Sequence, residues 1–88
     1  MATRAEHDAK AELMVRHWGE RIAIRRRELR RDSDGEPWSQ QDLADALDTD
    51  QAQVSKWERG IQEPKLASKY ALAEVLGISV DRLFPHYP

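Results

Sequence analysis

The polar residues between positions 51 and 59 have types and spacing that suit hydrogen bonding to a nucleic acid. On a helix they form one outward face with small, amide, hydroxyl or cationic side chains: Gln51, Ala52, Ser55, Lys56 and Arg59. The major groove of DNA is about 12 Å wide and admits one helix, provided that the residues at its leading end are not bulky and can hydrogen-bond base edges. The first chemistry to consider is therefore contact with bases.

Other kinds of chemistry have no such pattern in this sequence. The three histidines, His7, His17 and His86, are too far apart to form a metal-ligand motif. The chain has no cysteine, which excludes disulfides, thiolate metal sites and a cysteine nucleophile. No nucleophile with a neighbouring base stands out. We therefore expect no enzyme activity, no metal site and no cofactor.

Capping residues predict a short helix just before the polar face. We expect it to run from about Gln40 to Leu47, because Ser39 can cap it and Asp42 can return the bond as a shortened capping box. Trp38 before the cap and Leu43 after it fit a hydrophobic staple.

A second short helix carries the polar face itself. Asp50 can cap a helix from about Gln51 to Arg59. Val54 and Trp57 turn inward on this helix, and Gly60 is suited to end it in the left-handed conformation. Two short helices joined by a turn of three or four residues form a helix-turn-helix, in which the second helix reads DNA.

A longer helix is predicted before this pair. Inward-facing residues recur at three- and four-residue steps from about Asp8 to Arg31, namely Leu13 or Met14, Trp18, Ile22, Arg25 or Arg26, and Leu29. A glycine costs about 1 kcal/mol relative to alanine inside a helix. Gly19 therefore leaves open whether this is one helix or two joined near that residue. Turn-forming residues from Arg31 to Pro37 then predict a loop.

Two more helices are predicted near the carboxyl end. Pro64 suits the first turn of a helix that ends at Gly77. The expected apolar stripe of that helix comprises Leu66, Tyr70, Ala73 and Leu76. Ser79 can cap a brief last helix through Phe84, from which three side chains pack back against the core: Val80, Leu83 and Phe84.

Length and composition predict one small helical domain. Of the 88 residues, 40% are apolar, and these recur at helical spacing. No segment approaches the roughly 18 apolar residues of a membrane span, and no signal peptide is visible, so we expect a cytoplasmic protein without membrane association. The net charge of −2 argues against DNA binding, since such domains are usually basic. Six arginines between Arg21 and Arg31 nevertheless form a local basic stretch that can attract phosphate.

Three strings of residues extend the pattern beyond the two helices. They are Ser39-Gln40-x-x-Leu43-Ala44 followed by Val54-Ser55-x-Trp57-Glu58-x-Gly60-x-x-x-Pro64, then Ala73-x-x-Leu76-Gly77-Ile78-Ser79-Val80-Asp81-x-Leu83-Phe84, and Gly19-Glu20-Arg21-Ile22 followed by Arg26. Together they resemble the Cro/C1-type (XRE) family of repressors. The resemblance implies an all-α, compact five-helix, lambda-repressor-like DNA-binding domain over residues 19–84. Residues 1–18 would be a helical N-terminal extension and residues 85–88 a C-terminal tail.

The resemblance also implies which residues touch bases. Gln51 and Ala52 match the leading positions of the recognition helix, where a glutamine can bind N6 and N7 of adenine with two hydrogen bonds. Lys56, one turn on, suits guanine or a phosphate. Gln53 and Ser55 are further candidates, although Gln53 lies toward the flank of the helix and Ser55 can bond to its own backbone.

Three other positions match family contacts with the DNA backbone, and two match an internal ion pair. Gln40 would touch a phosphate from the start of the second helix, while Arg59 and Lys65 would touch the sugar-phosphate strand beyond the recognition helix. Arg26 and Glu58 match a structural ion pair that ties the recognition helix to the first helix. Because Arg25 and Arg27 flank Arg26, it stays open which of the three arginines pairs with Glu58.

The sequence departs from the family pattern at several points. Asp48 replaces the glycine usual in the turn, although aspartate tolerates left-handed geometry better than most residues. Asp48 and Asp50 place negative charge near the expected phosphates. The loop from Arg31 to Pro37 is longer than is typical, and Lys69 stands at a usually apolar position, where its stem can pack while its ammonium group reaches water.

The expected partner is double-stranded DNA with a pseudo-palindromic operator, bound by two copies of the chain. The resemblance implies a repressor in a bacterial cell or a phage-infected host. The rival hypothesis, motivated by the acidic charge, is an antitoxin-like or other protein-interaction module that keeps the fold with weak DNA affinity. The first 18 residues are open to three interpretations: a flexible arm, a dimerisation helix or a longer first helix.

Overall fold

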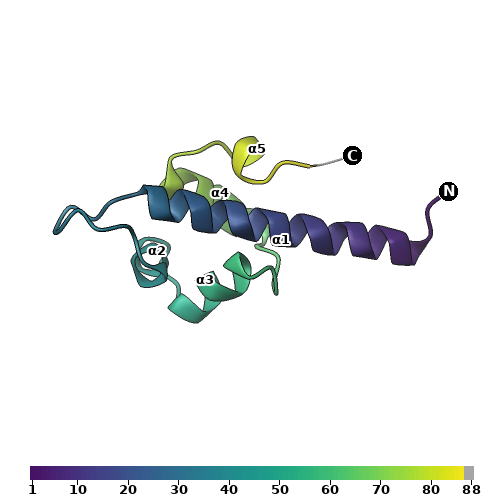
Figure 1. Ribbon diagram of the computed structural model, residues 1–88, viewed down its shortest axis with the longest axis horizontal. Helices are drawn as coiled ribbons and strands as arrows, with labels where there is room; N and C mark the ends of the chain where they lie inside the picture. Colours follow the sequence, from purple (N-terminus) through teal and green to yellow (C-terminus); the bar gives the residue numbers. More distant parts are fainter. Residues whose placement is uncertain (87–88) are drawn as a thin grey trace.

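The computed structural model describes residues 1–86 of the chain and consists of five α-helices (Figure 1). They are α1 (Arg4–Glu28), α2 (Gln40–Ala46), α3 (Gln51–Glu58), α4 (Leu66–Leu76) and α5 (Val80–Leu83). Within the described part there is no strand, only an isolated antiparallel bridge between Arg30 and Pro37. The predicted all-α, five-helix architecture is confirmed.

Helix α1 is continuous, and Gly19 is a packing residue rather than a joint. A Cβ atom at Gly19 would lie 2.4 Å from the Trp57 carbonyl oxygen and 2.6 Å from that of Glu58, so the backbones of α1 and α3 approach closely here. The helix begins earlier than expected because the Thr3 hydroxyl accepts a hydrogen bond from the Glu6 amide, and it ends at Glu28 rather than Arg31. Residues 1–13 are all exposed, and this end of α1 extends beyond the other helices (Figure 1).

The predicted loop before α2 is a small hairpin. The Arg31 amide donates to the Glu36 carbonyl, and the Trp38 amide donates to the Leu29 carbonyl at 3.0 Å. Gly35 allows the sharp turn at its tip with a φ of +74°. These backbone bonds end α1 and fix where α2 begins.

The core lies where α1 crosses the other helices. Its buried side chains come from every helix: Trp18, Ile22, Leu43, Ala44, Val54, Trp57, Leu72, Ala73, Leu76 and Leu83, with Phe84 just after α5. Burying one large apolar side chain contributes about 1.5–3 kcal/mol. The indole N–H of Trp18 donates to the Pro85 carbonyl at 2.7 Å, which ties the end of the described chain to α1.

The predicted stripe of α4 is wrong in its first half. Leu66 is 68% exposed and Tyr70 is 60% exposed. The inward position between them belongs to Lys69, whose ammonium nitrogen lies 4.2 Å from the centre of the Trp18 ring and 3.2 Å from the Glu63 carboxylate. The Lys69 side chain is 13% exposed, and the indole ring and the carboxylate together stabilise its charge. Residue hydrophobicity alone does not predict this arrangement.

Two smaller expectations are also corrected. Pro64 is buried just before α4 rather than in its first turn, because Lys65 is the N-cap and the helix begins at Leu66. Of the alternatives at the start of the apolar face of α1, Leu13 is 66% exposed and Met14 is the one packed against the core. Tyr87 and Pro88 of the predicted tail lie outside the described residues.

Across residues 1–86, no helix combines the length and the apolar character that a membrane span requires.

Candidate nucleic-acid interface

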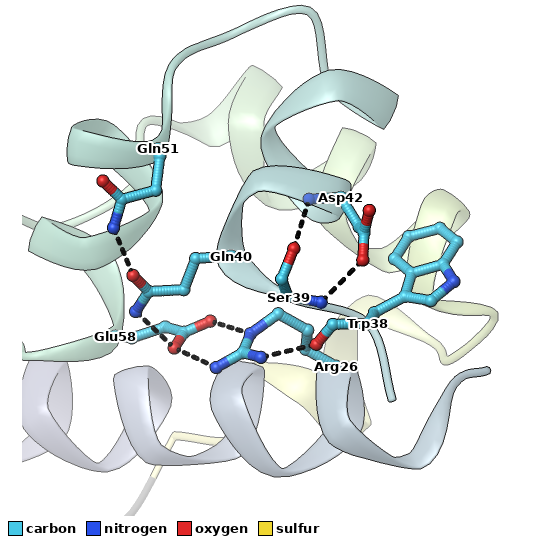
Figure 2. A network of polar contacts seen from close by, with 7 residues as sticks. All are labelled: Arg26, Trp38, Ser39, Gln40, Asp42, Gln51 and Glu58. Atoms are coloured by element: carbon cyan, nitrogen blue, oxygen red, sulfur yellow. Dashed lines mark hydrogen bonds and ion pairs between the residues drawn. The ribbon is translucent and has the colours of Figure 1, made fainter. Parts of the chain in front are cut away.

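The capping residues of α2 and α3 act as their sequence predicts. The Ser39 hydroxyl accepts from the Asp42 amide at 3.0 Å, and the Asp42 carboxylate accepts from the Ser39 amide at 2.8 Å, which completes a capping box (Figure 2). The Asp50 carboxylate accepts from the Gln53 amide at 2.8 Å. The charge of Asp50 is therefore used at the start of α3, where the helix dipole favours it.

The turn between α2 and α3 contains Asp48 in the left-handed conformation. Its φ is +56°, and it is the one non-glycine residue with a positive φ among those described. The Thr49 amide donates to the Ala44 carbonyl at 2.9 Å across the turn. Aspartate adopts this region more readily than most residues, so the turn keeps the geometry that a glycine would provide.

A buried ion pair links α1 to α3. Arg26 Nε lies 2.7 Å from Glu58 Oε2, and Arg26 Nη2 lies 2.8 Å from Glu58 Oε1 (Figure 2). The two side chains are only 9% and 5% exposed, and Arg26 Nη1 also donates to the Trp38 carbonyl. The hydrogen bonds with Glu58 raise the pKa of Arg26 above its usual value despite burial. The pair thus fixes α3 and the residue before the α2 cap relative to α1.

Two glutamines extend this network to the surface. Gln40 Nε2 donates to Glu58 Oε1 at 3.0 Å, and Gln51 Nε2 donates to Gln40 Oε1 at 2.5 Å (Figure 2). A carboxylate only accepts, so Gln40 must turn its amide nitrogen toward Glu58 and its oxygen toward Gln51. Gln51 in turn gives a nitrogen to Gln40, and no bond to its own oxygen occurs within residues 1–86.

The other candidate base contacts divide into two sets. Ala52 and Lys56 are exposed on the same outer face of α3 as Gln51. Gln53 and Ser55 are half-buried and have partners within the chain: Gln53 donates to the Gln62 side chain at 2.9 Å, and Ser55 accepts from Arg59 at 3.1 Å. The structure therefore groups Ala52 and Lys56 with Gln51 and turns Gln53 toward the loop before α4.

The basic candidates lie around α3. Arg59 is the C-cap of α3, and Lys65 is the N-cap of α4; both are exposed. Neither of them, nor Lys56, is in an ion pair within residues 1–86. Positive charges without acidic partners remain available to an anionic ligand.

Sequence reasoning missed the link from Gln40 to Gln51. It named Arg26 as the partner of Glu58 through the family resemblance and left the neighbouring arginines open. The choice depends on the helical face that packs on α3. Arg25 donates to the Leu76 carbonyl at 2.8 Å on the α4 side, and Arg26 alone meets Glu58. Gln40 and Gln51 lie 11 residues apart in the sequence, and they meet because of how α2 and α3 cross. No local pattern in the sequence predicts that crossing.

Comparison with known protein families matches residues 38–83, more than half of the chain, to a helix-turn-helix family of the Cro/C1 type. The chain belongs to this family. As a member of this family, also called XRE, the chain has the all-α lambda-repressor-like fold and is a DNA-binding helix-turn-helix regulator. The family consists of regulators rather than enzymes. Comparisons with curated proteins and with solved structures gave no match.

Proposed function

We propose that this XRE regulator is a repressor that binds a specific double-stranded DNA sequence through the outer face of α3. The observation that carries the proposal is the hydrogen-bonded chain from Glu58 through Gln40 to Gln51. It holds an exposed amide at the leading end of α3 in one orientation. A side chain held in this way loses less conformational entropy when it binds a base than a free one would.

The orientation of the Gln51 amide suits adenine. One N–H of Gln51 is used by Gln40, while the oxygen and the second N–H remain for a ligand. Adenine presents an N6 donor beside an N7 acceptor in the major groove, which is the complementary pair. Ala52 leaves room for a base or a thymine methyl group, and Lys56 can reach guanine or a phosphate one turn further along.

Backbone contacts would position the helix without reading sequence. Gln40 retains one amide N–H for a phosphate, while Arg59 and Lys65 flank the end of α3. Such contacts contribute affinity that falls with rising salt, whatever the base sequence. Asp48 lies in the turn and would oppose them by repelling phosphate. We expect the affinity that remains to fall with rising salt, because the contacts of Arg59 and Lys65 are ionic.

Two copies would bind one operator. A single α3 of eight residues reaches only a few base pairs, and two copies on a pseudo-palindrome double the number of bases read. Half-sites would then lie one helical turn apart, about 34–36 Å. The protein would act in the cytoplasm of a bacterial or phage-infected cell. A protein bound to such an operator excludes other proteins from the same DNA, so repression of transcription is the expected effect.

The experiment is a selection from random duplex DNA followed by binding titrations across salt concentrations. We expect a recovered half-site that contains adenine and a specific affinity that exceeds the non-specific affinity by about 1,000-fold or more. Failure to bind any duplex at low salt would contradict the proposal. That result, together with capture of a protein partner, would favour the alternative of a protein-interaction module that has lost DNA affinity.

A further inference from the structure

A groove of about 410 Å³ lies between α1 and the helix-turn-helix. Helix α1 lines it with Ile24 and Arg27, while the start of α2 contributes Gln40 and the end of α3 contributes Arg59. The groove therefore joins two of the proposed backbone contacts, Gln40 and Arg59, to a stretch of α1 that has no assigned role.

Among the residues that the structure describes, the two guanidinium groups of this groove have no carboxylate partner. The Arg27 side chain is exposed and forms no hydrogen bond or ion pair within residues 1–86, whereas the side chains of its neighbours in α1 are engaged: Arg26 by a carboxylate and Arg25 by a backbone carbonyl. Within residues 1–86, the guanidinium group of Arg59 donates to the hydroxyl of Ser55 and to no other group. Both cations thus remain available to an anion.

The two acidic residues of the groove differ in whether their carboxylates are already paired. Glu58 also lines the groove, but two hydrogen bonds from Arg26 and one from Gln40 occupy its carboxylate. Glu20 is the remaining acidic group of the lining and is exposed. Ile24 is 56% exposed and adds an apolar surface beside Arg27.

We infer that this groove holds a phosphate of the DNA backbone between Arg27 and Arg59, so that α1 contacts the DNA together with α2 and α3. The planar guanidinium group of an arginine can donate two hydrogen bonds to two oxygens of one phosphate. A second guanidinium group from the facing wall of the groove would fix the position of the DNA strand. The apolar side chain of Ile24 suits the carbon atoms of the adjoining sugar. This inference rests on the proposed function and adds Arg27 as a positioning residue.

The test compares Arg27→Ala with Arg82→Ala, a substitution that removes the same charge from α5. Helix α5 lies on the other side of α1 from α2 and α3 (Figure 1), so its arginine should be remote from the DNA. Each variant is titrated with the selected duplex and with a scrambled duplex at several salt concentrations. Thermal unfolding shows that each variant is folded.

We expect Arg27→Ala to weaken binding of both duplexes by the same factor, about 5–10-fold, and to reduce the slope of log K against log salt by about 1. Arg82→Ala should stay within about twofold of wild type. Arg27→Lys should keep the salt slope but bind more weakly, because it retains the charge without the fork. Glu20→Gln should strengthen binding about two- to threefold by removing a repelling charge from the groove.

The groove contact and the proposed function fail in different ways. If wild type binds DNA and Gln51→Ala loses selectivity, but Arg27→Ala behaves as Arg82→Ala does, the groove contact is overturned and the proposed function stands. If wild type binds no duplex, both are overturned.

Discussion

The inner face of α3 is buried against α1 and α2, whereas its outer face is exposed and has few contacts within the chain. Val54 is fully buried, Trp57 is 7% exposed, and the Glu58 side chain is 5% exposed within its ion pair. On the outer face, Ala52 and Lys56 are exposed. The inner face determines where α3 lies, and the outer face is left to meet a ligand. Substitutions on the two faces should therefore affect different measurements.

The largest effect is expected at the inner face. Arg26→Ala leaves the Glu58 carboxylate buried without its charge partner, which should lower the free energy of unfolding by about 3–5 kcal/mol. That is a large share of the 5–15 kcal/mol typical of a small domain. Urea unfolding followed by circular dichroism measures it. The matched control is Arg27→Ala, the exposed neighbour, which should change stability by less than about 0.5 kcal/mol; equal effects of the two would contradict the role assigned to the ion pair.

The contact between α1 and α3 predicts the next effect. Gly19→Ala should destabilise the fold by about 1–3 kcal/mol, because the new methyl group would lie 2.4 Å from the Trp57 carbonyl oxygen. Helix propensity alone predicts the opposite sign, a gain of about 1 kcal/mol. Thermal unfolding of the variant distinguishes the two. A rise in Tm would show that α1 and α3 do not pack as closely as the structure has them.

A substitution on the outer face of α3 should change DNA binding rather than the free energy of unfolding. Gln51→Ala should cost about 1–3 kcal/mol on the selected operator, relax specificity at one base pair, and leave stability within about 0.5 kcal/mol of wild type. Titrations with duplexes that differ at single positions measure this loss. Arg59→Ala is the contrast, since it should weaken binding to all sequences alike. Unchanged selectivity in Gln51→Ala would remove that residue from the base contacts.

The smallest effect concerns pH and the cap of α2. A hydrogen bond from the Ser39 backbone amide is the main cause that lowers the pKa of Asp42 below its usual value. A carboxyl group whose pKa is lowered by folding stabilises the fold above its unfolded pKa of about 4, and this contribution is lost as the pH falls through the folded pKa. We expect Tm to decrease below about pH 4, and to decrease less steeply in Asp42→Asn. The pKa of Asp34 is lowered as well, chiefly by the Glu36 amide, so Asp42→Asn should leave part of the dependence in place.

The order and type of the helices could be predicted from the sequence because their signals are local. Ser39 and Asp50 each bond to a backbone amide three residues away, and Gly77 takes the left-handed conformation that ends α4. These interactions depend on neighbours along the chain, so a pattern of residue types is enough to predict them.

The errors arise where contacts between distant residues decide the outcome. Lys69 faces inward only because Trp18 and Glu63 meet it there, and this displaced the predicted stripe of α4. Gly19 looks like a break in a helix until the backbone of α3 is placed against it. The contact between Gln40 and Gln51 likewise depends on the crossing of two helices.

The most direct test of DNA binding through the outer face of α3 is a ¹H–¹⁵N correlation spectrum of the protein titrated with the selected duplex. We predict the largest shifts at the backbone amides of Gln51, Ala52 and Lys56 and at the side-chain amides of Gln40 and Gln51. Amides of α4 and α5 should shift little. Shifts centred on α5, or none at all at low salt, would contradict the proposed interface.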